Sequence, residues 1–136
     1  FYCMSLFFVA SAMQDCQADR VVQIQQSTWP LRNDLRKLKN IIAAHKCTLP
    51  KEQLLYFKQC EDDFKKRAGS VSQHLDNVIK QLDHIRMDAS KQLYVHMNKH
   101  FNKAEEHLEN AKEELGDYKI IVKTMTKIDV DANPKL

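Results

Sequence analysis

The sequence predicts an all-α fold, a disulfide-stapled bundle of four to five helices. Apolar residues recur at three- and four-residue spacing along most of the chain, as they do on the buried face of a helix. Only two glycines and three prolines occur in 136 residues, which leaves no material for tight hairpin turns or Gly-rich phosphate loops. Its length and its 43% hydrophobic content are those of one globular domain, expected to span residues 1–136 with an irregular tail at 127–136.

The first expected helix covers about residues 2–27. Residues 1–14 carry no charged side chain, yet this stretch is too short to span a bilayer. We interpret it as a helix buried in the bundle. The alternative is a membrane-inserting segment or the end of a signal peptide, because residues 9–12 (Val-Ala-Ser-Ala) resemble a small-residue cleavage site.

The second and third expected helices lie between two pairs of helix-ending signals. Thr28 and Pro30 predict a break, with Thr28 as an N-cap and Pro30 in the first turn of the next helix. That helix ends at 47–50, and the third runs from about Lys51 to Arg67, closed by a glycine at position 69. The apolar stripes of the two helices are Leu31, Leu35, Leu38, Ile42 and His45, and Leu54, Phe57 and Phe64.

A fourth helix is expected to begin at Ser70, which forms a capping-box pattern with Gln73. Its stripe continues to Met125 without a proline, and one helix of that length would measure about 80 Å, too long for a compact domain. We therefore expect a turn near 100–102, where the following residues form a second capping pattern, or alternatively a break near 88–90. The stripe consists of Val71, Leu75, Val78, Leu82, Ile85, Leu93, Met97, Phe101, Ala104, Leu108, Ala111, Leu115, Tyr118, Val122 and Met125.

The four cysteines predict two disulfides between helices and, from these, secretion. No CxxC pair or zinc-finger spacing is present, so disulfides are favoured over zinc, with free buried thiols as the alternative. Cys3 and Cys16 are thirteen residues apart, as are Cys47 and Cys60, and this equal spacing fits two rungs between two helices. Parallel helices would give Cys3–Cys47 and Cys16–Cys60; antiparallel helices would give Cys3–Cys60 and Cys16–Cys47. An intervening helix favours the parallel option.

Charge is distributed unevenly along the chain. Residues 30–67 hold ten basic and five acidic side chains, whereas residues 102–118 hold six acidic and two basic ones. A net charge of +3 is too small to demand nucleic acid, but a split distribution can steer a protein partner. The basic residues proposed to contact such a partner are Arg32, Arg36, Lys65, Lys66 and Arg67.

No pattern predicts catalysis, a cofactor or a metal site. His96 and His100 have metal-ligand spacing, but we interpret them as surface or half-buried residues. Residues 129–133 resemble the start of a calcium loop, which a proline at the required glycine position rules out. The glutamates of 105–114 have Lys103 and Lys112 as neighbours, which predicts a solvated, salt-bridged face rather than acid–base chemistry. The chain is therefore expected not to be an enzyme.

In length, in the four cysteines Cys3, Cys16, Cys47 and Cys60, and in its continuous helical pattern, the chain resembles the anophensin and albicin group of mosquito salivary proteins. That resemblance implies an all-helical inhibitor of a host plasma cascade, such as the alternative complement convertase or contact activation. It carries no functional residue over to this sequence.

The expected function is therefore that of a secreted, monomeric salivary-type protein. It would block a complement or contact-pathway complex, most of all the alternative-pathway C3 convertase, by occupying a protein surface. Two alternatives stay open. One is a helical carrier of a small hydrophobic ligand, held among Phe7, Phe8, Phe57, Phe64 and Phe101. The other is a membrane-active helical protein that inserts residues 1–13.

Overall fold

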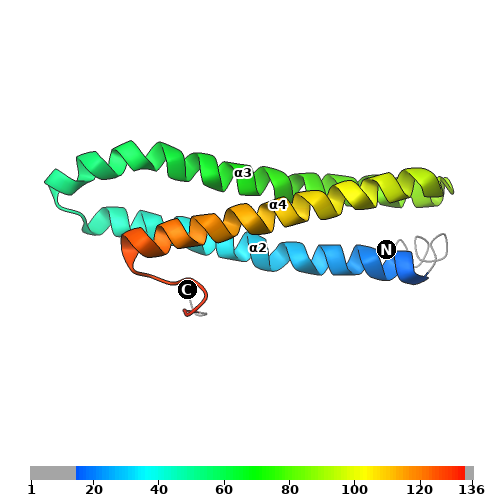
Figure 1. The fold of residues 1–136 in the computed structure, drawn as a ribbon, viewed down its shortest axis with the longest axis horizontal. Helices are drawn as coiled ribbons and strands as arrows, with labels where there is room; N and C mark the ends of the chain where they lie inside the picture. Colours follow the sequence, from blue (N-terminus) through cyan, green and yellow to red (C-terminus); the bar gives the residue numbers. More distant parts are fainter. Residues whose placement is uncertain (1–14, 134–136) are drawn as a thin grey trace.

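The computed structural model describes residues 15–133 and shows three long helices side by side (Figure 1). Helix α2 spans Asp15–Thr48, α3 spans Lys51–Ser90 and α4 spans Tyr94–Thr126. Short connections make α3 antiparallel to the other two, and its 40 residues give the bundle a length of about 60 Å. The prediction of an all-α fold is confirmed, but the expectation of four to five stapled helices is wrong.

Helix α2 does not break at Pro30, the first place where the predicted boundaries fail. Thr28, the expected N-cap, instead donates its hydroxyl back to the carbonyl oxygen of Gln25 at 2.7 Å, and Ser27 does the same to Gln23 at 2.8 Å. These back-bonds occupy carbonyl groups next to the turn that the proline interrupts. Because Pro30 lies on an exposed face, its ring meets solvent rather than the core.

Helix α3 likewise continues through the expected boundary at Gly69. Ser70 makes no capping box; its hydroxyl donates across the bundle to the Glu114 carboxylate of α4 at 2.8 Å. The chain reverses later, at 91–93, where Gln92 adopts a left-handed φ of 58°. The expected turn at 100–102 is wrong, and the alternative break near 88–90 is confirmed.

The absence of a break at Pro30 also separates Cys16 from the other two described cysteines. Cys16 and Cys47 lie near the two ends of one helix, about 47 Å apart along its axis. Cys60 is near the start of α3, at the end of the bundle where α2 and α3 are joined, so the predicted Cys16–Cys60 bridge does not exist. Neither does the alternative Cys16–Cys47 bridge. Both bridges proposed for Cys3 fall on a residue outside the described part of the chain.

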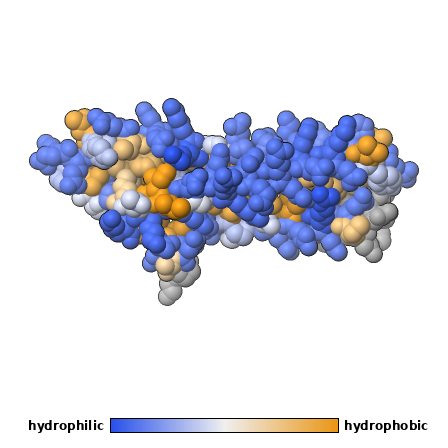
Figure 2. Space-filling view, in the orientation of Figure 1, coloured by the Kyte–Doolittle hydropathy of each residue, from blue (hydrophilic) through white to orange (hydrophobic). Residues whose placement is uncertain are grey.

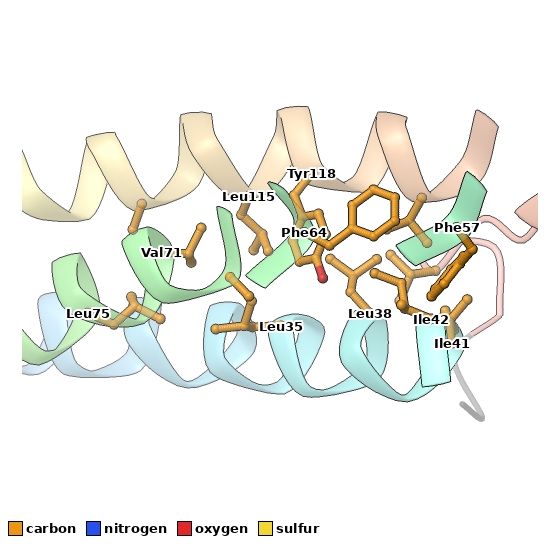
Figure 3. Packing of buried hydrophobic residues seen from close by; sticks show 14 residues of the cluster. Leu35, Leu38, Ile41, Ile42, Phe57, Phe64, Val71, Leu75, Leu115 and Tyr118 are labelled. Carbon is orange, nitrogen blue, oxygen red and sulfur yellow. The ribbon is translucent and has the colours of Figure 1, made fainter. Parts of the chain in front are cut away.

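The core consists of two hydrophobic clusters that follow one another along the bundle. The cluster at the α2–α3 junction end includes Phe57, Phe64 and Tyr118, whose rings fill the space between the helices (Figure 3). The cluster at the far end is built around Phe101 and Met97. Leu31 packs against both clusters, and the apolar stripes expected from the sequence supply most of the buried residues.

Residues 127–133 form no helix or strand, as expected for the tail, yet they pack on the bundle. The Val130 side chain is buried in the cluster at the junction end. The Lys119 ammonium lies 2.8 Å from the Asp34 carboxylate of α2 and 3.0 Å from that of Asp131. This shared cation joins the tail, α2 and α4.

Candidate functional site

An apolar groove opens between α3 and α4 near the α2–α3 junction, and we call it the α3–α4 groove. Its volume is about 570 Å³. Figure 2 shows hydrophobic side chains gathered over this end of α3 and α4, on a face that is otherwise largely hydrophilic. Tyr56 is 71% exposed and Ile120 65%, and the neighbouring Leu55 is 68% exposed. The lining residues are Tyr56, Gln59, Cys60, Asp63 and Phe64 of α3, and Ile120, Ile121, Thr124 and Met125 of α4.

The groove exists because each helix carries more apolar residues here than one core face can bury. Residues 54–57 (Leu-Leu-Tyr-Phe) and 120–122 (Ile-Ile-Val) are consecutive apolar runs. Successive helical residues are 100° apart, so such a run must place some side chains beside the core stripe. Phe57 and Val122 are buried, whereas Tyr56 and Ile120 are left on the surface. These runs are the sequence signal for the groove, and the periodic apolar stripes alone do not reveal it.

A second groove lies between α2 and α3, and we call it the α2–α3 groove. Its volume is about 400 Å³. Apolar side chains form its floor, one of them contributed by α4, and lysines from both helices form its rim. The floor consists of Ile42, Ala43, Phe57, Phe64, Ala68 and Tyr118, and the other lining residues are Lys39, Lys46, Glu61, Lys65 and Gly69.

The five basic residues predicted to bind a partner do not line one common hollow. Lys65 lines the α2–α3 groove, whereas Lys66 and Arg67 line a separate hollow beside Glu114 of α4. Most of these cations also have a partner within the chain. The recorded contacts are Arg32 to Asp76 at 2.6 Å, Arg36 to Asn33 at 2.9 Å, Lys65 to Glu61 at 3.4 Å and Arg67 to Asp63 at 2.9 Å.

The candidate ligand-binding phenylalanines are also separated. Phe57 and Phe64 stand 6.0 Å apart between their ring centroids at the junction end. Phe101 is buried in the other cluster, beneath the Arg20 guanidinium at 4.6 Å. Phe7 and Phe8 lie outside the described residues, as does the segment 1–13 that was considered for membrane insertion. Within residues 15–133, none of the helices is long and apolar enough to cross a bilayer.

Histidines pair across the α3–α4 interface, a feature that their sequence spacing did not reveal. His84 and His100 stack with ring centroids 4.9 Å apart, and His74 and His107 bring their Nδ1 atoms to 3.1 Å. Among the described residues, no group of three or more His, Cys, Asp or Glu side chains is arranged to hold a metal ion. Each histidine pair joins α3 to α4.

His100 makes the stability of the bundle sensitive to acid. Burial lowers its pKa below the ordinary 6.5, and this effect outweighs the Asp88 carboxylate, which raises it; His84, Lys103 and His96 lower it further. Below pH 6.5 the unfolded chain therefore binds a proton more readily than the folded chain does, so stability is full above that pH and falls below it.

We expect the urea midpoint of the protein to drop between pH 7.5 and pH 5.5, and to drop less in His100→Gln. Asn98→Gln, at an exposed position of the same helix and without a change of charge, is the matched control and should keep the wild-type drop. An equal drop in all three proteins would contradict the assignment to His100.

Comparison with known proteins places no relative beside this chain. No protein-family model matches it, no curated protein matches it, and no solved structure matches it. The likeness to the anophensin and albicin group therefore stays a prediction.

Proposed function

We propose that this protein is a non-enzymatic binding protein that acts by occupying the surface of a protein partner through the α3–α4 groove. The observation that carries the proposal is the exposure of Tyr56 and Ile120, which line an apolar hollow, with the exposed Leu55 next to Tyr56 in the chain. Contiguous exposed apolar surface of this kind marks interaction sites on soluble proteins. An aromatic residue in such a patch is a frequent anchor of binding energy.

The polar groups of the groove favour a protein partner over a purely apolar ligand. Gln59, Asp63 and Thr124 stand among the apolar lining residues and can hydrogen-bond a partner's backbone or side chains. The Asp63 carboxylate is held by Arg67 at 2.9 Å, so one ion pair fixes its orientation at the edge. An apolar centre with a polar edge is the usual arrangement of a protein interface.

The partner class is a proposal that rests on the salivary resemblance. We propose a secreted protein that blocks a complement or contact-pathway complex, above all the alternative-pathway C3 convertase. The resemblance in length and helical pattern supports this. The cysteine argument for secretion does not, because the predicted Cys16–Cys60 disulfide is wrong.

Replacing Ile120 by Asp should weaken partner binding at least tenfold, because an unpaired carboxylate would be buried in the interface. The assay adds the intact protein to serum and follows alternative-pathway C3 deposition and contact-pathway clotting time, alongside capture of plasma proteins. Val95→Asp is the matched control, since Val95 is 73% exposed and lies at the opposite end of α4.

Two results would count against the proposal. If micromolar protein changes neither assay and captures nothing from plasma, the plasma partner is wrong. If a partner is captured equally by wild type and Ile120→Asp, the α3–α4 groove is not the binding surface.

A further inference from the structure

The α2–α3 groove combines an apolar floor with cations from two helices, a pairing that the proposed function does not use. Ile42, Phe57 and Phe64 offer contact to a hydrocarbon or an aromatic ring. Its volume of about 400 Å³ falls in the range of small-molecule sites, roughly 300–1,000 Å³.

A hydroxyl group contributed by α4 reaches the edge of this groove. Tyr118 is 1% exposed and lines the groove from α4, but its hydroxyl makes no hydrogen bond to any residue in the range 15–133. Figure 3 shows the hydroxyl directed away from α4 and toward α2, close to Phe64 and Leu38. Burial raises the pKa of Tyr118 to about 12, so the group is a protonated donor at neutral pH. In the described part of the chain, the fully buried side-chain atoms that lack a hydrogen-bond partner belong to Glu61 and Asp88, so the Tyr118 hydroxyl keeps contact with the groove and can donate to an acceptor bound there.

The charge at the rim complements an anion. Lys39 directly follows the buried Leu38 in α2. It is exposed and forms no ion pair with a described residue. Lys46 and Lys65 share the single Glu61 carboxylate, at 2.9 Å and 3.4 Å, which leaves the rim with a net positive charge. These two lysines hold the pKa of Glu61 below its usual value, with Lys46 the larger cause.

Gly69 lines the groove without contributing a side chain. It lies within α3, where glycine weakens a helix, and its φ is not in the left-handed region. A Cβ built on Gly69 would meet no atom within 4 Å. A side chain at this position, next to Ala68, would therefore extend into empty space.

We propose that the α2–α3 groove binds an amphiphilic monocarboxylate, with an apolar body of about a medium alkyl chain or an aryl ring. One carboxylate oxygen accepts a hydrogen bond from the Tyr118 hydroxyl. The other carboxylate oxygen faces the ammonium groups of Lys39 and Lys65. The apolar body extends over Ile42 and Phe57. A charge-assisted hydrogen bond together with apolar burial gives the site its selectivity for a charged head over a neutral one.

Titration calorimetry of the full-length chain with dodecanoate, against dodecanol of the same chain length, tests the head group. We expect saturable binding of dodecanoate at one site and at least tenfold weaker binding of dodecanol. Equal affinities, or no binding of dodecanoate below its micellar concentration, would overturn the proposal.

Three variants test the site. Tyr118→Phe and Lys39→Gln should each weaken dodecanoate binding about tenfold, while Lys99→Gln, at an exposed position in the far half of α4, should leave it unchanged. Gly69→Leu should abolish binding and still raise the unfolding temperature, because it fills the groove and favours the helix. Unchanged binding in Tyr118→Phe, Lys39→Gln or Gly69→Leu would show that the carboxylate lies elsewhere.

Ile120→Asp should bind dodecanoate like the wild type, so the protein-binding proposal and this one can fail independently.

Discussion

Replacing Phe101 by Ala should lower the free energy of unfolding by about 3–5 kcal/mol, the usual loss when a buried phenylalanine is truncated. The ring is fully buried in the cluster at the far end of the bundle, and the Arg20 guanidinium lies over it at 4.6 Å. The substitution removes both apolar contacts and the cation–π contact. Typical domains have about 5–15 kcal/mol of stability in total, so the variant should be close to unfolding at 37 °C.

Chemical denaturation followed by far-ultraviolet circular dichroism measures this loss. Val95→Ala removes a side chain of the same helix that is mostly exposed, and should change stability by less than about 0.5 kcal/mol. A loss below about 1 kcal/mol in Phe101→Ala would mean that the ring is not enclosed by the three helices.

Replacing Pro30 by Ala should stabilise the protein by about 2 kcal/mol. Proline inside a helix costs about 3 kcal/mol relative to alanine, because it lacks the N–H and its ring displaces the preceding turn. Up to about 1 kcal/mol of this gain is offset, since alanine makes the unfolded chain more flexible. Pro30 is exposed, so no core contact is lost.

The same substitution distinguishes an uninterrupted α2 from a helix that begins at Pro30. If a helix began at Pro30, proline would suit that first turn and alanine would be neutral or harmful. Pro50→Ala provides the matched control, because Pro50 is the N-cap of α3 with φ of −68° and its change should have little effect. A stability gain in Pro30→Ala that does not exceed that of Pro50→Ala would contradict an uninterrupted α2.

The apolar periodicity predicted most of the buried residues, although Leu93 of the expected stripe is exposed, but the boundary signals were misleading. Leu38, Leu75 and Leu115 all follow their expected stripes into the core. Proline, glycine and capping patterns failed because tertiary packing of a long stripe outweighs a local cost of a few kcal/mol. The true turn carries a left-handed residue that is Gln92 rather than glycine, so composition gave no sign of it.

The candidate sites were harder to predict than the core. The cysteine pairing depended on how many helices the chain forms. Because the helix continues through Pro30, where a break was expected, the Cys16–Cys60 prediction was wrong. The α2–α3 groove requires the register of three helices, since its floor includes Tyr118 of α4 and its rim Lys39 and Lys65. The spacing of residues along the chain does not determine how the three helices are aligned with one another.

The division of the core into two clusters has a consequence for local opening. Among residues 15–133, Leu31 alone packs against both clusters, and the level between them carries the His74–His107 pair. Each half can then lose its packing while the other stays folded. Amide hydrogen exchange should therefore report two groups of opening energies, one for the half around Phe101 and one for the half around Tyr118. Added dodecanoate should slow exchange in the Tyr118 half, while the other half keeps its own opening rate.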